Sequence, residues 1–211
     1  MSRPASQTTA TAIAAVTLVG WNGVFLGTAA TGVLAPIAAF ASAVALGALG
    51  LQRHDLSRWF TVSVGRVAGG IGLGVALAGL SWWAWMLAVQ LPLDLEPAVA
   101  SLYATLRKPP GPVAGLPLVV LTIVAEEIIF RGLLQESLRA RLGPARAIGA
   151  VAALYALANL GSGTWVLPVM ALLLGLFWGW LAERTRGLVV PLLCHLVWDI
   201  ILFVLLPLVP A

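Results

Sequence analysis

Charged residues are scarce in this sequence: they make up 9% of the 211 residues, whereas 61% are hydrophobic. A soluble domain carries about 25% charged residues, so this scarcity excludes a soluble protein and indicates an integral membrane protein. The net charge is +4, but the basic residues lie in short clusters between apolar segments, as the positive-inside rule requires. We therefore expect the lipid bilayer, and no nucleic acid, as a partner.

Cysteine is also scarce, and one common protease motif is missing. The single cysteine, Cys194, excludes an internal disulfide. No His-Glu-x-x-His run occurs in the chain, so the sequence does not support a zinc protease of the site-two type.

Long apolar segments fill most of the chain. They predict an all-α fold, a polytopic membrane bundle of about seven transmembrane helices that forms a single domain over residues 1–211. In the long link before the fourth span, residues 97–106 predict a short helix on the membrane surface. The predicted spans are residues 9–27, 29–51, 67–91, 116–138, 147–160, 165–182 and 188–208.

The basic residues predict an orientation for these spans. With the N-terminus in the cytoplasm, most arginines lie on the inner side and only Arg107 and Lys108 lie outside, which is the expected asymmetry. The orientation would change if the short fifth span were re-entrant. We expect a bacterial inner (plasma) membrane, since no organelle-targeting segment is visible. The inner arginines are Arg3, Arg53, Arg58, Arg66, Arg139, Arg141, Arg146, Arg184 and Arg186.

The third predicted span contains a run of glycines: Gly69, Gly70, Gly72, Gly74 and Gly79. A glycine-rich loop that cradles phosphate is one interpretation, but no basic or hydroxyl partner follows the run. Small residues at helical spacing favour close helix–helix packing, which is the interpretation we prefer.

Three ionisable side chains, Glu126, Glu127 and Arg131, lie in the middle of the fourth span. On a helix, Glu127 and Arg131 are four residues apart, about 6 Å along the axis, so they can pair. A buried structural ion pair explains these two residues, but it leaves Glu126 unexplained. Because a charge in hydrocarbon costs several kcal/mol, an intramembrane cluster of this kind indicates a functional site.

The seventh span contains a second polar pair, His195 and Asp199, again four residues apart. In the predicted topology this pair lies at a depth that overlaps with Glu126. Asn159, near the outer end of the fifth span, is the third polar position inside the membrane. Alone, a histidine or an asparagine here would indicate a hydrogen bond between helices.

Two carboxylates and an imidazole together suit hydrolysis of a peptide bond. A buried glutamate can take a proton from water, which makes Glu126 the candidate general base. Glu127, held by Arg131, is then an electrostatic or structural partner. His195 and Asp199 can polarise the scissile carbonyl or stabilise the oxyanion, with further help from a buried amide such as Asn159.

These residues resemble the CPBP intramembrane proteases, which include the type II CAAX prenyl endopeptidases and Abi-like bacteriocin-processing or immunity relatives. The first motif of the family, Glu-Glu-x-x-x-Arg, is matched by Glu126, Glu127 and Arg131. The third motif, His-x-x-x-Asn or Asp, is matched by His195 and Asp199.

The resemblance covers roughly residues 116–203. Between the first and third motifs, residues 175–185 also look like the family's penultimate helix and turn. It implies an endopeptidase (a hydrolase) that acts on membrane-associated peptides or lipidated proteins, including prenylated CAAX-type substrates. In the metalloprotease description of the family it also implies zinc or another divalent cation, with Glu126 and His195 as candidate ligands, although nothing in the sequence requires a metal.

The second motif departs from the family. The family has Phe-x-x-x-His, and the corresponding residues here are Tyr155 and Asn159. An amide cannot take up a proton at physiological pH and is a poor ligand for zinc-like ions. Either Glu126 acts as the base without this histidine, or activity is reduced or lost.

Other functions remain open at this point. A non-catalytic membrane scaffold or immunity protein could retain the same pocket, and a small transporter could relay protons through buried charges. A rhomboid-like dyad of Ser162 and His195 would leave both glutamates unexplained. Cys194 points to a different helix face from His195, which disfavours a Cys–His pair.

Overall fold

The regular elements of the described residues are all helices. The computed structural model describes residues 7–28, 30–51, 56–92 and 94–209, and in these residues it contains no strand, so the all-α prediction is confirmed. The helices are α1 (Gln7–Thr28), α2 (Leu34–Leu51), α3 (Leu56–Trp59), α4 (Val64–Ala88), α5 (Leu95–Leu106), α6 (Gly111–Ala114), α7 (Leu116–Glu126), α8 (Glu136–Leu142), α9 (Pro144–Ala158), α10 (Val166–Thr185) and α11 (Val189–Asp199), with π-helices η1 (Glu127–Gln135) and η3 (Ile200–Leu205) and a short 3₁₀ helix η2 (Leu160–Ser162).

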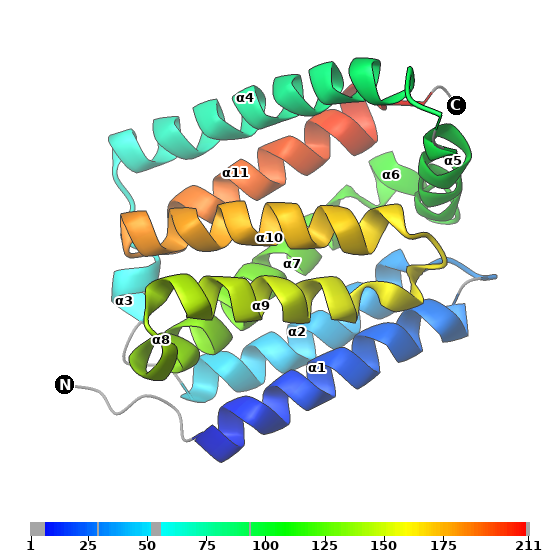
Figure 1. The fold of residues 1–211 in the computed structure, drawn as a ribbon. Coiled ribbons are helices and arrows are strands. Elements are labelled where there is room, and N and C mark those ends of the chain that lie inside the picture. Colours follow the sequence, from blue (N-terminus) through cyan, green and yellow to red (C-terminus); the bar gives the residue numbers. More distant parts are fainter. Residues whose placement is uncertain (1–6, 29, 52–55, 93, 210–211) are drawn as a thin grey trace.

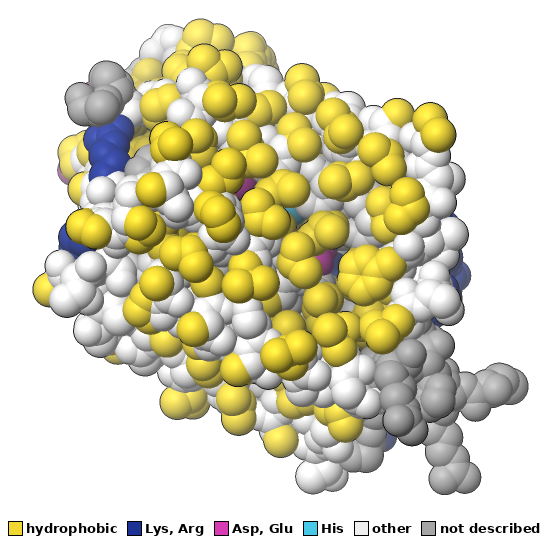
Figure 2. Space-filling view, turned by 180° about the vertical axis from the view of Figure 1, so that it is seen from behind, with side chains coloured by type: hydrophobic (Ala, Val, Ile, Leu, Met, Phe, Trp, Pro, Cys, Tyr) yellow, Lys and Arg dark blue, Asp and Glu magenta, His cyan; other side chains and the backbone are white. Residues whose placement is uncertain are grey.

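The long helices run back and forth between two ends of the molecule (Figure 1). In the described residues, five helices are long and apolar enough to cross a membrane, and Val189–Leu205 is a shorter apolar helix. Side chains such as Val19, Leu26 and Leu46 are exposed, as expected for a surface that faces lipid. Hydrophobic side chains cover most of the face in Figure 2. The chain is therefore an integral membrane protein built as a polytopic helical bundle.

Each predicted span corresponds to one helical run of the structure, with shifted ends. The second helix begins at Leu34 rather than at residue 29, because Gly32 takes a φ of 111° and ends the turn between α1 and α2. Position 29 itself lies outside the described residues. The third helix begins earlier than predicted, at Val64, where the Ser63 side chain caps it by accepting a hydrogen bond from the Arg66 N–H.

The fourth predicted span is the centre of the bundle. It consists of α7, the π-helix η1 and α8, which follow one another without a break. All nine residues of η1 are buried. Because lipid cannot hydrate ionised side chains, a segment that carries Glu127 and Arg131 must be surrounded by other helices. Helices α2, α9, α10 and α11 all contact α7 or η1.

Glycines on α4 allow it to lie close against α11. A Cβ atom added at Gly70 would lie 2.8 Å from the Leu193 Cβ, and one added at Gly74 would lie 2.8 Å from the Cys194 carbonyl oxygen. For Gly70 and Gly74, this confirms the packing interpretation. A Cβ added at Gly72 would meet no atom within 4 Å, so this glycine does not contribute to the contact.

Gly74→Ala is therefore expected to destabilise the bundle, because the new methyl group would collide with the backbone of α11. The expected loss is about 1–3 kcal/mol, the usual cost of overpacking. Gly72→Ala on the same helix is the matched control and should leave stability unchanged or slightly raised. Thermal unfolding of both variants in detergent measures the effect, and equal melting temperatures would contradict the packing role.

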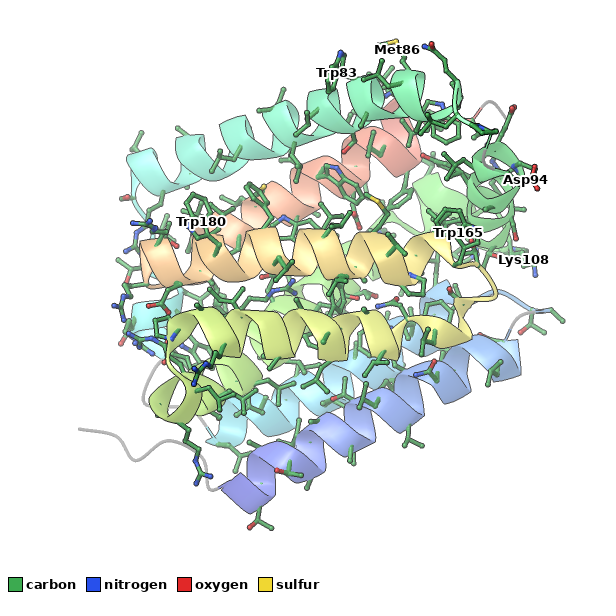
Figure 3. All side chains as sticks on the ribbon, viewed as in Figure 1. Trp83, Met86, Asp94, Lys108, Trp165 and Trp180 are labelled. Carbon is green, nitrogen blue, oxygen red and sulfur yellow. The ribbon has the colours of Figure 1, made fainter. Side chains whose placement is uncertain are left out.

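Most of the described basic side chains gather at one end of the bundle. That end carries α3, α8, the start of α4 and α9 and the end of α10, whereas Lys108 lies at the other end near Asp94 (Figures 1 and 3). The predicted asymmetry is thus present in the described residues, while Arg3 and Arg53 lie outside them. Which end faces the cytoplasm stays a prediction. The gathered residues are Arg58, Arg66, Arg139, Arg141, Arg146, Arg184 and Arg186.

Candidate active site

The predicted pair on the fourth span is present and fully enclosed. Arg131 Nη1 lies 3.3 Å from Glu127 Oε1, and each side chain is 1% exposed. The guanidinium carbon of Arg131 also lies 4.9 Å from the centroid of the Tyr155 ring and 5.6 Å from that of the Trp178 ring. Aromatic faces attract a cation, and this attraction is stronger where water is excluded.

His195 hydrogen-bonds Glu127 directly. His195 Nδ1 lies 2.9 Å from Glu127 Oε1, although the two residues are 68 positions apart in the sequence. When Glu127 is ionised it can only accept, so Nδ1 carries the proton and Nε2 is directed away from Glu127. The Trp178 ring stacks on the imidazole, with centroids 3.6 Å apart and planes 20° apart, so the orientation of the His195 ring is fixed from two sides.

Glu126 lies on the other side of the imidazole. Its Oε2 is 3.8 Å from His195 Nε2 and accepts a hydrogen bond of 2.7 Å from the Tyr155 hydroxyl. Asp199 Oδ1 lies 3.9 Å from the same His195 nitrogen. The structure therefore brings Glu126, Glu127, Arg131, His195 and Asp199 into one cluster.

A change of helix type coincides with the two glutamates. An α-helix turns about 100° per residue, which would direct Glu126 and Glu127 apart. The π-helix η1 begins at Glu127, and its i→i+5 hydrogen bonding places more residues in each turn. The second π-helix, η3, begins directly after Asp199. Single π-turns within α-helices are often found at functional sites.

Asn159 lies at the edge of this cluster. Its amide nitrogen donates a hydrogen bond of 2.9 Å to the carbonyl oxygen of Tyr155, one turn earlier in α9, and its side chain is buried at the helix end. It lines the same cavity as Glu126 and His195. The structure thus places Asn159 on the cavity wall, with its amide nitrogen bound locally to its own helix.

A large apolar cavity opens beside the cluster. It has a volume of about 610 Å³, and α1, α2, α4, α5, α7, α9, α10 and α11 line it mainly with hydrophobic side chains. Glu126, His195 and Asp199 are on its wall, while Glu127 and Arg131 are not. In Figure 2, the colours of acidic side chains and of histidine are visible between hydrophobic side chains. The site can therefore present a carboxylate and an imidazole to an apolar ligand.

The described residues contain no group of three ligands for a metal ion. A catalytic zinc ion takes three protein ligands at about 2 Å and one water molecule. Among the described residues, no three His, Cys, Asp or Glu side chains are grouped so that they could hold a metal ion. The mechanism proposed below includes no step through a metal.

The alternative nucleophiles do not join the cluster. The Ser162 hydroxyl donates a hydrogen bond to the Thr164 carbonyl oxygen at 3.2 Å rather than to His195. Cys194 is buried, and its backbone carbonyl faces Gly74 on α4. Neither residue forms a dyad with His195, whose two nitrogens lie near carboxylates.

Comparison with known families identifies the part of the chain that carries this cluster. Residues 108–201 match the family model described as "Type II CAAX prenyl endopeptidase Rce1-like". This region of the chain is therefore similar to the Rce1-like family. No curated protein and no solved structure matches the chain.

The Rce1-like region contains all six predicted site residues and confirms the resemblance drawn from the motifs. At the level of the family, it implies a CAAX-type intramembrane protease that acts on a peptide or protein. Its bounds are near those of the predicted family-like core, residues 116–203. The treatment of residues 1–211 as a single domain stays a prediction.

Sequence reasoning missed two side chains that contact the cluster. Tyr155 was noted only as the counterpart of a phenylalanine, yet its hydroxyl binds Glu126. Its position four residues before Asn159, on the same helix face, was the available signal. Trp178 lies in the segment 175–185 that resembled the family, but nothing in the sequence indicated that it stacks on His195.

Proposed function

We propose that this protein is an intramembrane endopeptidase that hydrolyses peptide bonds of membrane-associated substrates, including prenylated CAAX-type proteins. The observation that carries the proposal is the approach of Glu126 and His195, 3.8 Å apart, on the wall of an apolar cavity. The Rce1-like match supports the substrate class. The apolar lining suits a lipid chain, since burial of apolar surface is worth about 25 cal/mol per Å².

In the proposed reaction, Glu126 removes a proton from a water molecule as its oxygen attacks the scissile carbonyl carbon. Tyr155 donates to Oε2, so we assign the proton transfer to Oε1. The carbon–nitrogen bond then breaks, and Glu126 returns the proton to the departing amine. A general base of this kind contributes about 10²–10⁴-fold to the rate.

His195 is assigned to the oxyanion. This role requires a proton on both ring nitrogens, so that Nδ1–H faces Glu127 and Nε2–H faces the oxygen that gains negative charge. Glu127 and Arg131 hold the ring in position, and Asp199 Oδ1 lies 3.9 Å from Nε2. A fixed donor in a site without bulk water is worth several kcal/mol in the transition state.

The second candidate function is a non-catalytic membrane scaffold or immunity protein with a degenerate site. Asn159 is the observation that favours it, because the family's second motif has a histidine at this position and Asn159 lies on the cavity wall. In the proposed protease, Asn159 lines the substrate cavity and Tyr155 supports Glu126 in place of that histidine.

A panel of quenched peptides, with and without a prenyl group, separates the two candidates. We expect the purified protein in liposomes to cleave prenylated peptides, and Asn159→His to cleave them about tenfold faster because an imidazole adds a proton acceptor to the wall. If neither protein cleaves any peptide, the proposed protease function is wrong. If only Asn159→His cleaves, the natural chain is the degenerate scaffold.

A further inference from the structure

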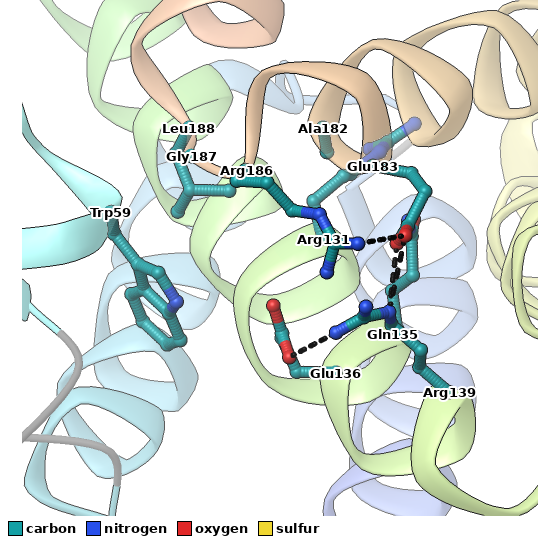
Figure 4. Close-up of a pocket in the computed structure, with 10 residues that line it drawn as sticks. All are labelled: Trp59, Arg131, Gln135, Glu136, Arg139, Ala182, Glu183, Arg186, Gly187 and Leu188. Atoms are coloured by element: carbon teal, nitrogen blue, oxygen red, sulfur yellow. Dashed lines mark hydrogen bonds and ion pairs between the residues drawn. The ribbon is translucent and has the colours of Figure 1, made fainter. Parts of the chain in front are cut away.

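A small polar pocket lies behind the catalytic cluster. It has a volume of about 10 Å³ and is separate from the apolar cavity, with which it shares no lining residue. Arg131 is on its wall, so one side chain connects this pocket with the Glu127–His195 pair. Figure 4 shows the ten lining residues, which come from α3, η1, α8, α10 and the turn that follows α10.

Three buried side chains of this pocket have unsatisfied polar atoms. Trp59 Nε1, Gln135 Oε1 and the guanidinium nitrogens of Arg131 have no hydrogen-bond partner among the described residues, although Arg131 Nη1 is ion-paired with Glu127. These residues are 2%, 4% and 2% exposed. A buried polar atom without a partner costs about 1–3 kcal/mol, so the site as a whole favours binding a polar ligand.

The polar atoms match the hydrogen-bonding capacity of water. Trp59 and Arg131 offer N–H donors, and Gln135 Oε1 offers an acceptor, so one water molecule can accept twice and donate once. Buried waters typically make about three such bonds, and the volume of the pocket is about what one water molecule needs.

The outer side of the pocket is charged and partly exposed. Arg139 Nε lies 3.0 Å from Glu183 Oε2, and Arg186 Nη2 lies 3.4 Å from Glu183 Oε1. Arg58 Nη2 lies 3.1 Å from Glu136 Oε1, with side chains 42% and 30% exposed. Arg139, Glu183 and Arg186 line the pocket at the arginine-rich end of the bundle, as does Glu136, the partner of Arg58 (Figure 4).

We infer that this pocket binds a water molecule and is the route by which water reaches the hydrolytic site from the arginine-rich end. The delivery role rests on the proposed function. In this scheme the two reactants enter by different routes. The lipidated substrate enters through the apolar cavity, and the water that each cleavage consumes enters through the polar pocket. Arg131 lies between them, with its guanidinium against Glu127 and the Tyr155 ring.

The water site is tested without any activity measurement. Brief hydroxyl-radical labelling of the purified protein, read by mass spectrometry, should oxidise Trp59 at least about fivefold faster than Trp21, because a bound water generates radicals beside a buried ring. The two tryptophans are 2% and 1% exposed, so exposure alone predicts equal rates. Equal labelling of Trp59 and Trp21 would overturn the water site.

The delivery role is tested by substitutions in the pocket. Gln135→Leu removes the acceptor and should slow Trp59 labelling and lower kcat about tenfold, with little change in KM. Trp59→Phe, which removes one donor and keeps an aromatic ring, should lower kcat in the same way. Ser137→Ala is the matched control, because it deletes a buried unpartnered hydroxyl that does not line the pocket.

The outcomes distinguish the two proposals. An unchanged kcat in both pocket variants, with active wild-type protein, would overturn the delivery role. A wild-type protein that labels at Trp59 but cleaves no peptide would leave the water site standing and overturn the proposed function together with the delivery role.

Discussion

Glu126→Gln is expected to lower peptide cleavage by about 10³-fold or more, because an amide cannot accept the proton of the attacking water. The substitution keeps the size of the side chain, and its carbonyl oxygen can still accept the hydrogen bond from Tyr155. The fold should therefore persist, with a melting temperature close to that of the wild type. Single-turnover cleavage of a prenylated peptide in liposomes measures the chemical step.

Glu96→Gln is the control for this prediction. It makes the same change at an exposed position in the first turn of α5, away from the cavity wall. We expect wild-type turnover from this variant. Cleavage by Glu126→Gln at a rate near that of Glu96→Gln would show that another group activates the water.

Arg131→Met is expected to cause the largest loss of stability, about 3–5 kcal/mol, because it leaves the Glu127 carboxylate buried without its cation. Glu127 is 0% exposed, and its Oε2 has no hydrogen-bond partner among the described residues. Methionine retains much of the apolar volume of the arginine side chain. The lost stability therefore measures the effect of removing the charge and not the effect of a new cavity. Unfolding in mixed micelles of increasing SDS content measures the free energy.

Two further variants test this explanation. The double variant Glu127→Gln with Arg131→Met should recover a large part of the lost stability, because no uncompensated charge remains in the bundle. Arg146→Met, an exposed position near the start of α9, should change stability by no more than about 0.5 kcal/mol. If Arg131→Met and Arg146→Met have equal stabilities, the buried pair does not stabilise the fold.

Much of the fold could be predicted because it follows from local composition. Apolar length determines where a helix spans the bilayer, and charge distribution separates the two ends of the bundle. The spacing of four residues identified the contacts of Arg131 with Glu127 and of His195 with Asp199, since residues one turn apart share a helix face. The small residues Gly70 and Gly74 marked the close approach of α4 to α11.

The distances between segments could not be predicted in this way. The bond from His195 to Glu127, the bond from Tyr155 to Glu126 and the stacking of Trp178 on His195 join residues on different helices. They depend on the rotation and depth of each helix, which are set by packing rather than by local sequence. The π-helix η1, which begins at Glu127, has no recognisable sequence signal.

The sequence by itself determined a membrane-embedded helical bundle and the residue types available for chemistry, because hydrocarbon tolerates only internally satisfied backbone and few charges. Only the tertiary structure decided which of those groups meet. It placed Glu126 on an apolar cavity, Arg131 beside a separate polar pocket, and His195 between the two glutamates. The physical reason is that contacts between helices arise from the packing of whole surfaces, which no single segment specifies.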